Sequence, residues 1–109
     1  MPRRYTILGQ INPSANVLTT LYNVPAGNSS VISSINIANL DANAAAFSIA
    51  ANVSGVATAN ANYLAWRVSI PGNDSIALSL GVTLNASSQL SVNANSSTLS
   101  FSAFGTEIY

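Results

Sequence analysis

Hydrophobic and polar residues alternate with a period of two along most of this chain, which is the pattern of β-strands that bury one of their faces. Small or polar residues separate the large side chains of the clearest example, the run Ile76, Leu78, Leu80, Val82 and Leu84. No segment combines a 3.6-residue period with a helix-capping residue. The pattern therefore predicts an all-β protein.

Turn-forming residues divide the alternating pattern into about eight strands. We expect these strands at residues 5–8, 17–24, 31–38, 47–53, 63–70, 75–84, 90–94 and 99–103. The last three are separated by short segments rich in Asn and Ser, which predicts a three-stranded meander. The longest irregular segment, 54–62, is expected to cross between sheets or to form an exposed loop.

About eight strands in 109 residues predict one antiparallel β-sandwich or jelly roll, in which two sheets cover each other's apolar faces. We expect this single domain to span residues 1–109, with residues 1–10 as an N-terminal arm plus a short strand. The alternation also predicts which side chains of the C-terminal third lie inside: Leu78, Leu80, Val82, Leu90, Val92, Leu99 and Phe101.

Charged residues are so few that they exclude most kinds of chemistry. The chain has three basic residues, all arginine, and three acids, with no histidine and no cysteine. Acid–base catalysis and metal sites need several such groups in one place, so we expect no enzyme, no metal and no cofactor. The sequence has no basic patch for nucleic acid, no membrane-spanning apolar run and no signal-peptide pattern. These features predict synthesis in the cytosol, with neither nucleic acid nor membrane as a partner.

Two of the three acids, Asp41 and Asp74, lie in turn-like contexts, where Asp commonly accepts hydrogen bonds from nearby backbone N–H groups. Calcium would need several further oxygen ligands around them, and glycosidase chemistry would need two carboxyl groups across one cleft. The sequence therefore favours a role in turn formation for both residues.

Trp66 followed by Arg67 is the most site-like pair in the sequence. Trp66 is in phase with Leu64 and Val68, so the alternation predicts that it packs in the core while Tyr63 and Arg67 face outward. Tyr and Arg are enriched at interface hot spots, which makes these two residues candidates for a subunit contact. The alternative is that Trp66 is exposed and, with Arg67, stacks a sugar or meets a partner.

Arg3 and Arg4 are the other two interface candidates, because they would hold an acidic neighbour; the alternative for them is a solvated terminal arm. The net charge of the whole chain is zero, which gives little electrostatic protection against self-association. We therefore expect a closed homo-oligomer, and specifically a trimer.

Four parts of the chain share turns and apolar positions with a known group of proteins: residues 7–10, residues 21–27 with 31–35, residues 70–74 and residues 99–108. In these parts the chain resembles small, β-rich virion structural proteins of tailed bacteriophages, especially aquatic phages. The resemblance spans nearly the whole chain and carries no catalytic motif. It implies a protein located in the virion and assembled in the host cytoplasm. Its partners would be further copies of itself and the major capsid protein or other virion proteins.

Three functions are open at this point. A head decoration (cement) protein that stabilises the capsid by subunit contacts is preferred, because small size and low charge suit a protein stabilised partly by its neighbours. A neck, baseplate or tail-fibre accessory protein is the alternative within the virion. A carbohydrate-binding module is the alternative from another class, with Trp66, Tyr63 and the many Asn side chains as its binding surface.

Overall fold

The computed structural model describes residues 3–53 and 60–108, apart from the side chains of Asn60 and Leu80. Eight strands and one short 3₁₀ helix make up most of these residues: β1 (Arg3–Ile11), β2 (Thr19–Asn23), β3 (Ser29–Asn39), β4 (Ala45–Val53), η1 (Asn60–Asn62), β5 (Tyr63–Ile70), β6 (Ser75–Leu84), β7 (Ser88–Ala94) and β8 (Leu99–Ile108). The predicted all-β class is confirmed. β8 extends beyond its predicted end at residue 103, where it continues to pair with β1 and β3, and the acid Glu107 in this extension is buried.

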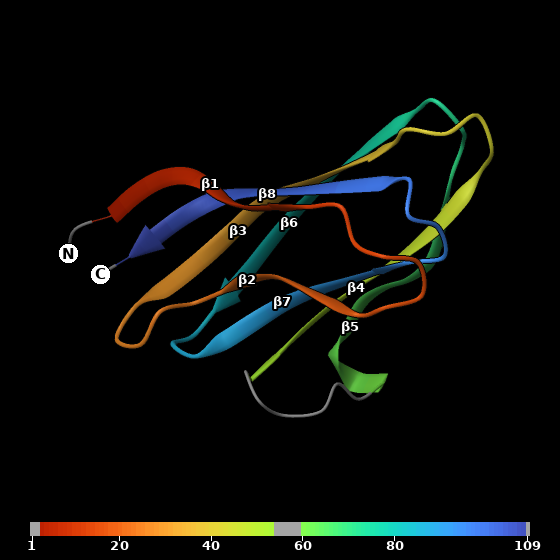
Figure 1. Ribbon diagram of the computed structural model, residues 1–109. Coiled ribbons are helices and arrows are strands. Elements are labelled where there is room, and N and C mark those ends of the chain that lie inside the picture. The colour runs from red at the N-terminus through yellow and green to blue at the C-terminus, as the bar shows by residue number, and fades with distance from the viewer. Residues whose placement is uncertain (1–2, 54–59, 109) are drawn as a thin grey trace.

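The strands form two four-stranded antiparallel sheets, as Figure 1 shows. The first sheet has the order β1-β8-β3-β6, and the second sheet has the order β2-β7-β4-β5. β1 pairs with β8, β2 with β7, β3 with β6 and β4 with β5, so the first half of the chain runs antiparallel to the second half. Further pairs, β3 with β8 and β4 with β7, complete the sheets. This rolled-up long hairpin is the jelly roll.

The predicted meander in the C-terminal third is wrong. β6 and β8 both lie in the first sheet but are separated by β3, whereas β7 lies in the second sheet. The short connections after β6 and β7 therefore cross between the sheets. A short connection requires only that two strand ends lie close together, and strands in facing sheets meet this requirement as well as neighbours in one sheet do. In contrast, β4 and β5, the strands on either side of segment 54–62, are neighbours in one sheet. Residues 54–59 of that segment lie outside the described residues.

The core lies between the two sheets and contains most of the predicted residues. Leu90, Val92, Leu99 and Phe101 are fully buried, as predicted. Phe101 of the first sheet meets Phe47 of the second edge to face, with ring centroids 6.1 Å apart. Leu78 and Val82 are only partly buried because β6 is an edge strand, and the side chain of Leu80 lies outside the described residues.

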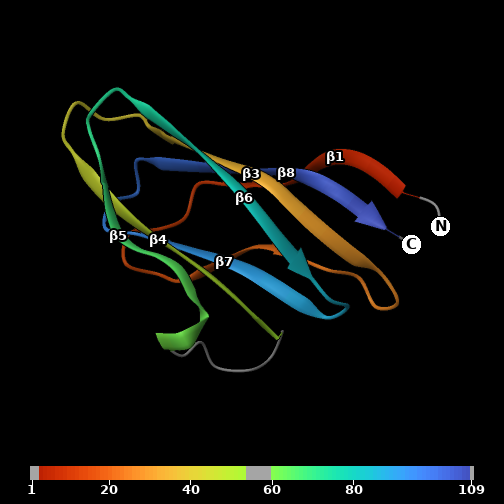
Figure 2. The ribbon, with the colours of Figure 1, turned by 180° about the vertical axis from the view of Figure 1, so that it is seen from behind.

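The two lateral sides of the sandwich differ. On the side where the edge strands β1 and β2 meet, a Cβ atom on Gly9 would collide with the backbone carbonyl of Leu21, so only glycine permits this approach. We call this the closed side. On the other side, β5 and β6 leave the turn at residues 71–74 and diverge, as Figure 2 shows from behind. We call this the open side.

Candidate functional site

A β-bulge in β5 determines what the open side displays. The register between β4 and β5 runs from Phe47 opposite Val68 to Ile49 opposite Ala65, so two residues of β5 stand against one of β4. Arg67 has a φ of 51°, and its backbone N–H donates a hydrogen bond of 3.0 Å to the Ser48 hydroxyl. The bulge shifts the alternation, so Ala65 and Val68 rather than Trp66 pack against the core.

The prediction that Trp66 packs in the core is therefore wrong. Its side chain is 56% exposed, and that of Leu64, in the same predicted phase, is 46% exposed. The alternation on which the prediction depended is preserved only at Val68 and Ile70, after the bulge. A bulge cannot be recognised dependably in a sequence, because it is defined by the backbone conformation of the extra residue and not by that residue's type.

The exposed Trp66 is held in a small aromatic and cationic cluster. Tyr63 meets it edge to face, with ring centroids 4.6 Å apart and an interplanar angle of 76°. The guanidinium carbon of Arg67 lies 5.0 Å from the centroid of the Trp66 ring, within the range of a cation–π contact. Arg67 is exposed as predicted, whereas Tyr63 is partly buried.

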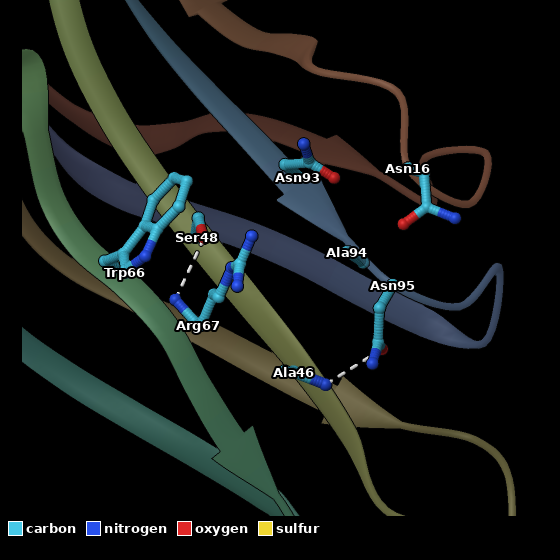
Figure 3. A pocket seen from close by; sticks show the side chains of 8 residues that line it. All are labelled: Asn16, Ala46, Ser48, Trp66, Arg67, Asn93, Ala94 and Asn95. Atoms are coloured by element: carbon cyan, nitrogen blue, oxygen red, sulfur yellow. Dashed lines mark hydrogen bonds between the residues drawn. The ribbon is translucent and has the colours of Figure 1, made fainter. Parts of the chain in front are cut away.

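Beside this cluster lies a pocket of about 330 Å³ on the second sheet. Figure 3 shows its walls, which come from β4, β5, the end of β7 and the segment between β1 and β2: Asn16, Ala46, Ser48, Trp66, Arg67, Asn93, Ala94 and Asn95. Arg67 is the one charged residue of this lining, and no carboxylate is part of it.

Short hydrogen bonds fix the backbone around the pocket. The backbone N–H of Asn16, whose φ is 60°, donates to the carbonyl of Ala94 at 2.7 Å. The Asn95 side-chain oxygen accepts the backbone N–H of Ala46 at 2.9 Å. Residue type alone marks Trp66 and Arg67 in the sequence, whereas the asparagines stand out only collectively, because Asn is frequent throughout the chain and none of these three has a distinctive context.

A second polar cluster lies on the closed side and is mostly buried. Arg4 donates to a carboxylate oxygen of Glu107 at 2.8 Å, and the Tyr22 hydroxyl donates to the other oxygen at 3.1 Å. Tyr22 also shares a hydrogen bond of 2.7 Å with the Ser30 hydroxyl. Among the four interface candidates, Arg4 thus forms an intramolecular ion pair while its side chain stays 62% exposed, and Arg3 lies exposed beside it on β1.

The environment shifts two pKa values in this cluster. The hydrogen bond from Arg4 lowers the pKa of the Glu107 carboxyl below its ordinary value, although burial acts in the opposite direction. Burial raises the pKa of the Tyr22 phenol, with the hydrogen bond to Ser30 opposing it. Glu107 is therefore held ionised and Tyr22 neutral, which is suited to a structural network.

The two remaining acids form turns, as predicted. The Asp41 carboxylate accepts the backbone N–H of Ala42 at 2.7 Å, and that of Asp74 accepts the backbone N–H of Ser75 at 2.8 Å. Within the described ranges, no three His, Cys, Asp or Glu residues come together as a metal site would require. The same ranges contain no helix of the length and apolar character needed to cross a membrane.

Comparison with solved structures finds similar folds in chains of virus particles. A chain of the infectious bursal disease virus particle of T13 symmetry matches 96% of this chain, with a TM-score of 0.56 and 13% identity. A chain of the VP2 subviral particle of the same virus matches 97% of it, with a TM-score of 0.57 and 14% identity. The match covers 30% and 32% of those chains, so this chain spans about a third of their length.

A pentameric capsid protein from metagenomic phage sequences also aligns, with a TM-score of 0.42 and 18% identity over 96% of this chain and 64% of the other. No protein-family model matches the chain, and no curated protein is similar to it in sequence. At such low identities, the likeness to the bursal disease virus chains establishes the fold alone, a jelly roll.

Proposed function

We propose that this protein is a structural component of a virus particle, and specifically a decoration (cement) protein bound to the head of a tailed bacteriophage. The observation that carries the proposal is the fold: nearly the whole chain forms a jelly roll similar to domains of capsid proteins. The near absence of ionisable groups agrees with a role in binding rather than catalysis.

The first sheet offers a surface for such contacts. Tyr5 and Ile7 of β1 are 76% and 53% exposed. Ile7 is paired with Phe104 of β8, and Tyr5 and Val31 are both paired with Thr106, so these side chains share the face opposite the core. We call Tyr5, Ile7, Val31 and Phe104 the outer strip.

The outer strip and the adjacent Arg3 are the surface that we propose to contact other virion subunits. Apolar side chains clustered on an outer face are characteristic of binding surfaces. The zero net charge favours self-association, and a homotrimer is the oligomer that we propose. Tyr63 and Arg67 lie in the other sheet, so in this arrangement they would contact a different neighbour.

The deciding experiment is release of the genome on heating, measured for particles with and without this protein. A cement protein binds only the assembled lattice and stabilises it by mass action, so particles without it should release their genome at a lower temperature. Identical release curves would exclude the cement function. A copy number in the tens or fewer per particle would then favour a neck, baseplate or tail-fibre position.

The contact surface has its own test. Ile7→Asp places a charge in the outer strip and should weaken oligomerisation and particle binding, with little effect on folding because Ile7 is exposed. Ala77→Asp is a suitable control, because Ala77 is an exposed residue of β6 that pairs with Asn36, outside the outer strip. Analytical ultracentrifugation at micromolar concentration reports the oligomer. A wild-type protein that stays monomeric both alone and on the particle would rule out the trimer.

A further inference from the structure

We propose that the pocket beside Trp66 binds a sugar that carries a carboxylate, such as a uronic or sialic acid residue of an acidic glycan, with Arg67 as the ligand of the carboxylate. This inference goes beyond the structural role in the particle, and the residues of the pocket lie outside the outer strip. It begins with an arginine whose charge is not neutralised within the described part of the molecule.

Arg67 has no acidic partner among the described residues, where the one ion pair joins Arg4 and Glu107. Its guanidinium contacts the ring of Trp66 at 5.0 Å instead. Figure 3 shows the Arg67 side chain between Trp66 on one side and Asn93 and Asn95 on the other. The N–H groups of a guanidinium point outward in its own plane, so they stay available when its face lies over an aromatic ring. Two of them match the two oxygens of a carboxylate.

The rest of the lining is suited to a sugar ring. Asn16, Asn93 and Asn95 bring three amide side chains, and an amide both donates and accepts hydrogen bonds, as sugar hydroxyl groups do. Trp66, which is 56% exposed, provides an apolar surface for the C–H groups of a ring. The volume of about 330 Å³ is at the small end of the range for ligand pockets, which is appropriate for one or two sugar residues.

Backbone strain at the pocket supports the same inference. Arg67 and Asn16 both have positive φ values, of 51° and 60°. Asn tolerates this region, but Arg is uncommon there, and such conformations concentrate at ligand sites. The bulge that strains Arg67 also turns it and Trp66 outward together, so the strained backbone is what builds the pocket wall.

The charge of the pocket decides the ligand class. A neutral glycan would leave the Arg67 charge unused, and a nucleic acid would require several cations to follow its phosphates. One cation with no carboxylate in the lining matches one anionic group. The amide donors and acceptors around Arg67 match the hydroxyl groups of a sugar that carries this anionic group.

The sole tryptophan of the chain, Trp66, makes the test direct, because the intrinsic tryptophan fluorescence reports only this site. The isolated wild-type protein is titrated with glucuronic acid and with N-acetylneuraminic acid, and in parallel with glucose and with acetate. At least one acidic sugar should change the fluorescence saturably, at concentrations about tenfold or more below those needed for glucose or acetate.

Two variants assign the effect to Arg67. Arg67→Gln should weaken binding of the acidic sugar by about tenfold or more, while Arg67→Lys should retain part of the affinity because it keeps the charge but loses the planar fork. Arg3→Gln, which removes an exposed arginine outside the pocket, should bind as the wild type does. Thermal melting of each variant establishes that it is folded.

The proposal would be overturned by the absence of a saturable change with either acidic sugar, by equal affinity for glucose and the acidic sugars, or by undiminished binding by folded Arg67→Gln. Equal affinity for acetate would also overturn it and would identify the pocket as a receptor for an acidic side chain of a neighbouring protein. Because the isolated protein is used, each result is independent of whether the protein is a capsid component.

Discussion

The closed side and the open side of this jelly roll carry the same kinds of side chain in different environments. On the closed side, Arg4 and Tyr22 both bond to the buried Glu107. On the open side, Arg67 and Tyr63 both contact Trp66, which is more than half exposed. The first group satisfies a buried acid, whereas the second group leaves hydrogen-bonding capacity at the surface.

The difference follows from how closely the edge strands approach. Where Gly9 allows β1 and β2 to meet, a polar side chain is desolvated and must find partners within the protein. Where β5 and β6 diverge, water satisfies the same groups, and no internal partner is needed. Thus the closed side and the core should contribute to stability and the open side to binding, and four pairs of substitutions test this division.

The largest expected effect compares two edge-to-face aromatic pairs. Phe101→Ala removes the buried ring that meets Phe47 and should lower the free energy of unfolding by about 3–5 kcal/mol. Trp66→Ala removes the exposed ring that meets Tyr63 and should lower it by less than about 1 kcal/mol. Urea denaturation measures both. Similar losses for the two variants would mean that Trp66 contributes to the core after all.

The next comparison tests the approach of the strands themselves. Gly9→Ala forces β1 away from the Leu21 carbonyl and should cost about 1–3 kcal/mol of unfolding free energy. Gly81→Ala is the matched control on the open side, where an added Cβ meets no atom, and it should be neutral or slightly stabilising in a strand. If chemical denaturation finds the two variants equally stable, the closed side is looser than described.

The third comparison exchanges the two arginines. Arg4→Ala leaves the buried Glu107 with Tyr22 but without its cation, which should cost about 1–2 kcal/mol, since the solvent exposure of Arg4 limits the loss. Arg67→Ala should change stability by less than about 0.5 kcal/mol, because Arg67 has no acidic partner among the described residues. Thermal unfolding distinguishes them, and a larger loss for Arg67→Ala would reverse the proposed division.

The smallest effect is a dependence on pH. The pKa of Glu107 is lowered in the folded protein, so its contribution is complete above the ordinary carboxyl pKa and is lost as the pH falls through the lowered value. Wild-type unfolding free energy should therefore decline below about pH 4. Glu107→Gln should flatten this decline, whereas Asp74→Asn, on the exposed turn, should retain it. Parallel acid profiles for wild type and Glu107→Gln would contradict the assignment.

The sequence was sufficient for the number of strands and for much of the core. Alternation identifies which face of a strand is apolar, which is why Leu90 and Phe101 were placed correctly. It does not say which strand lies alongside, since any antiparallel neighbour satisfies the same pattern. The meander was therefore predicted where the chain instead passes between sheets after β6 and β7.

The candidate site was predictable only in part. Trp66 and Arg67 drew attention as residue types, but their phase in β5 placed Trp66 inside, and a single bulge reversed it. Asn93 and Asn95 are close in sequence, but Asn16 joins them only because β2 pairs with β7, and Arg67 of β5 joins them only because β4 pairs with both β7 and β5. Such a juxtaposition is a property of topology, which local patterns do not encode.

The pairing of β1 with β8 also sets the order of events in folding. Arg4 and Glu107 are 103 positions apart, so this ion pair forms only after nearly all of the described chain has been synthesised. Strand partners so distant in sequence make folding slow, on the order of milliseconds to seconds. The entropy of closing a long loop is lost before the contacts between the strands contribute stabilising energy. During that interval β1 exposes unpaired backbone groups next to Tyr5 and Ile7, and a copy truncated before β8 would keep them exposed. The exposed edge of β1 would thus be covered only once β8 has paired with it.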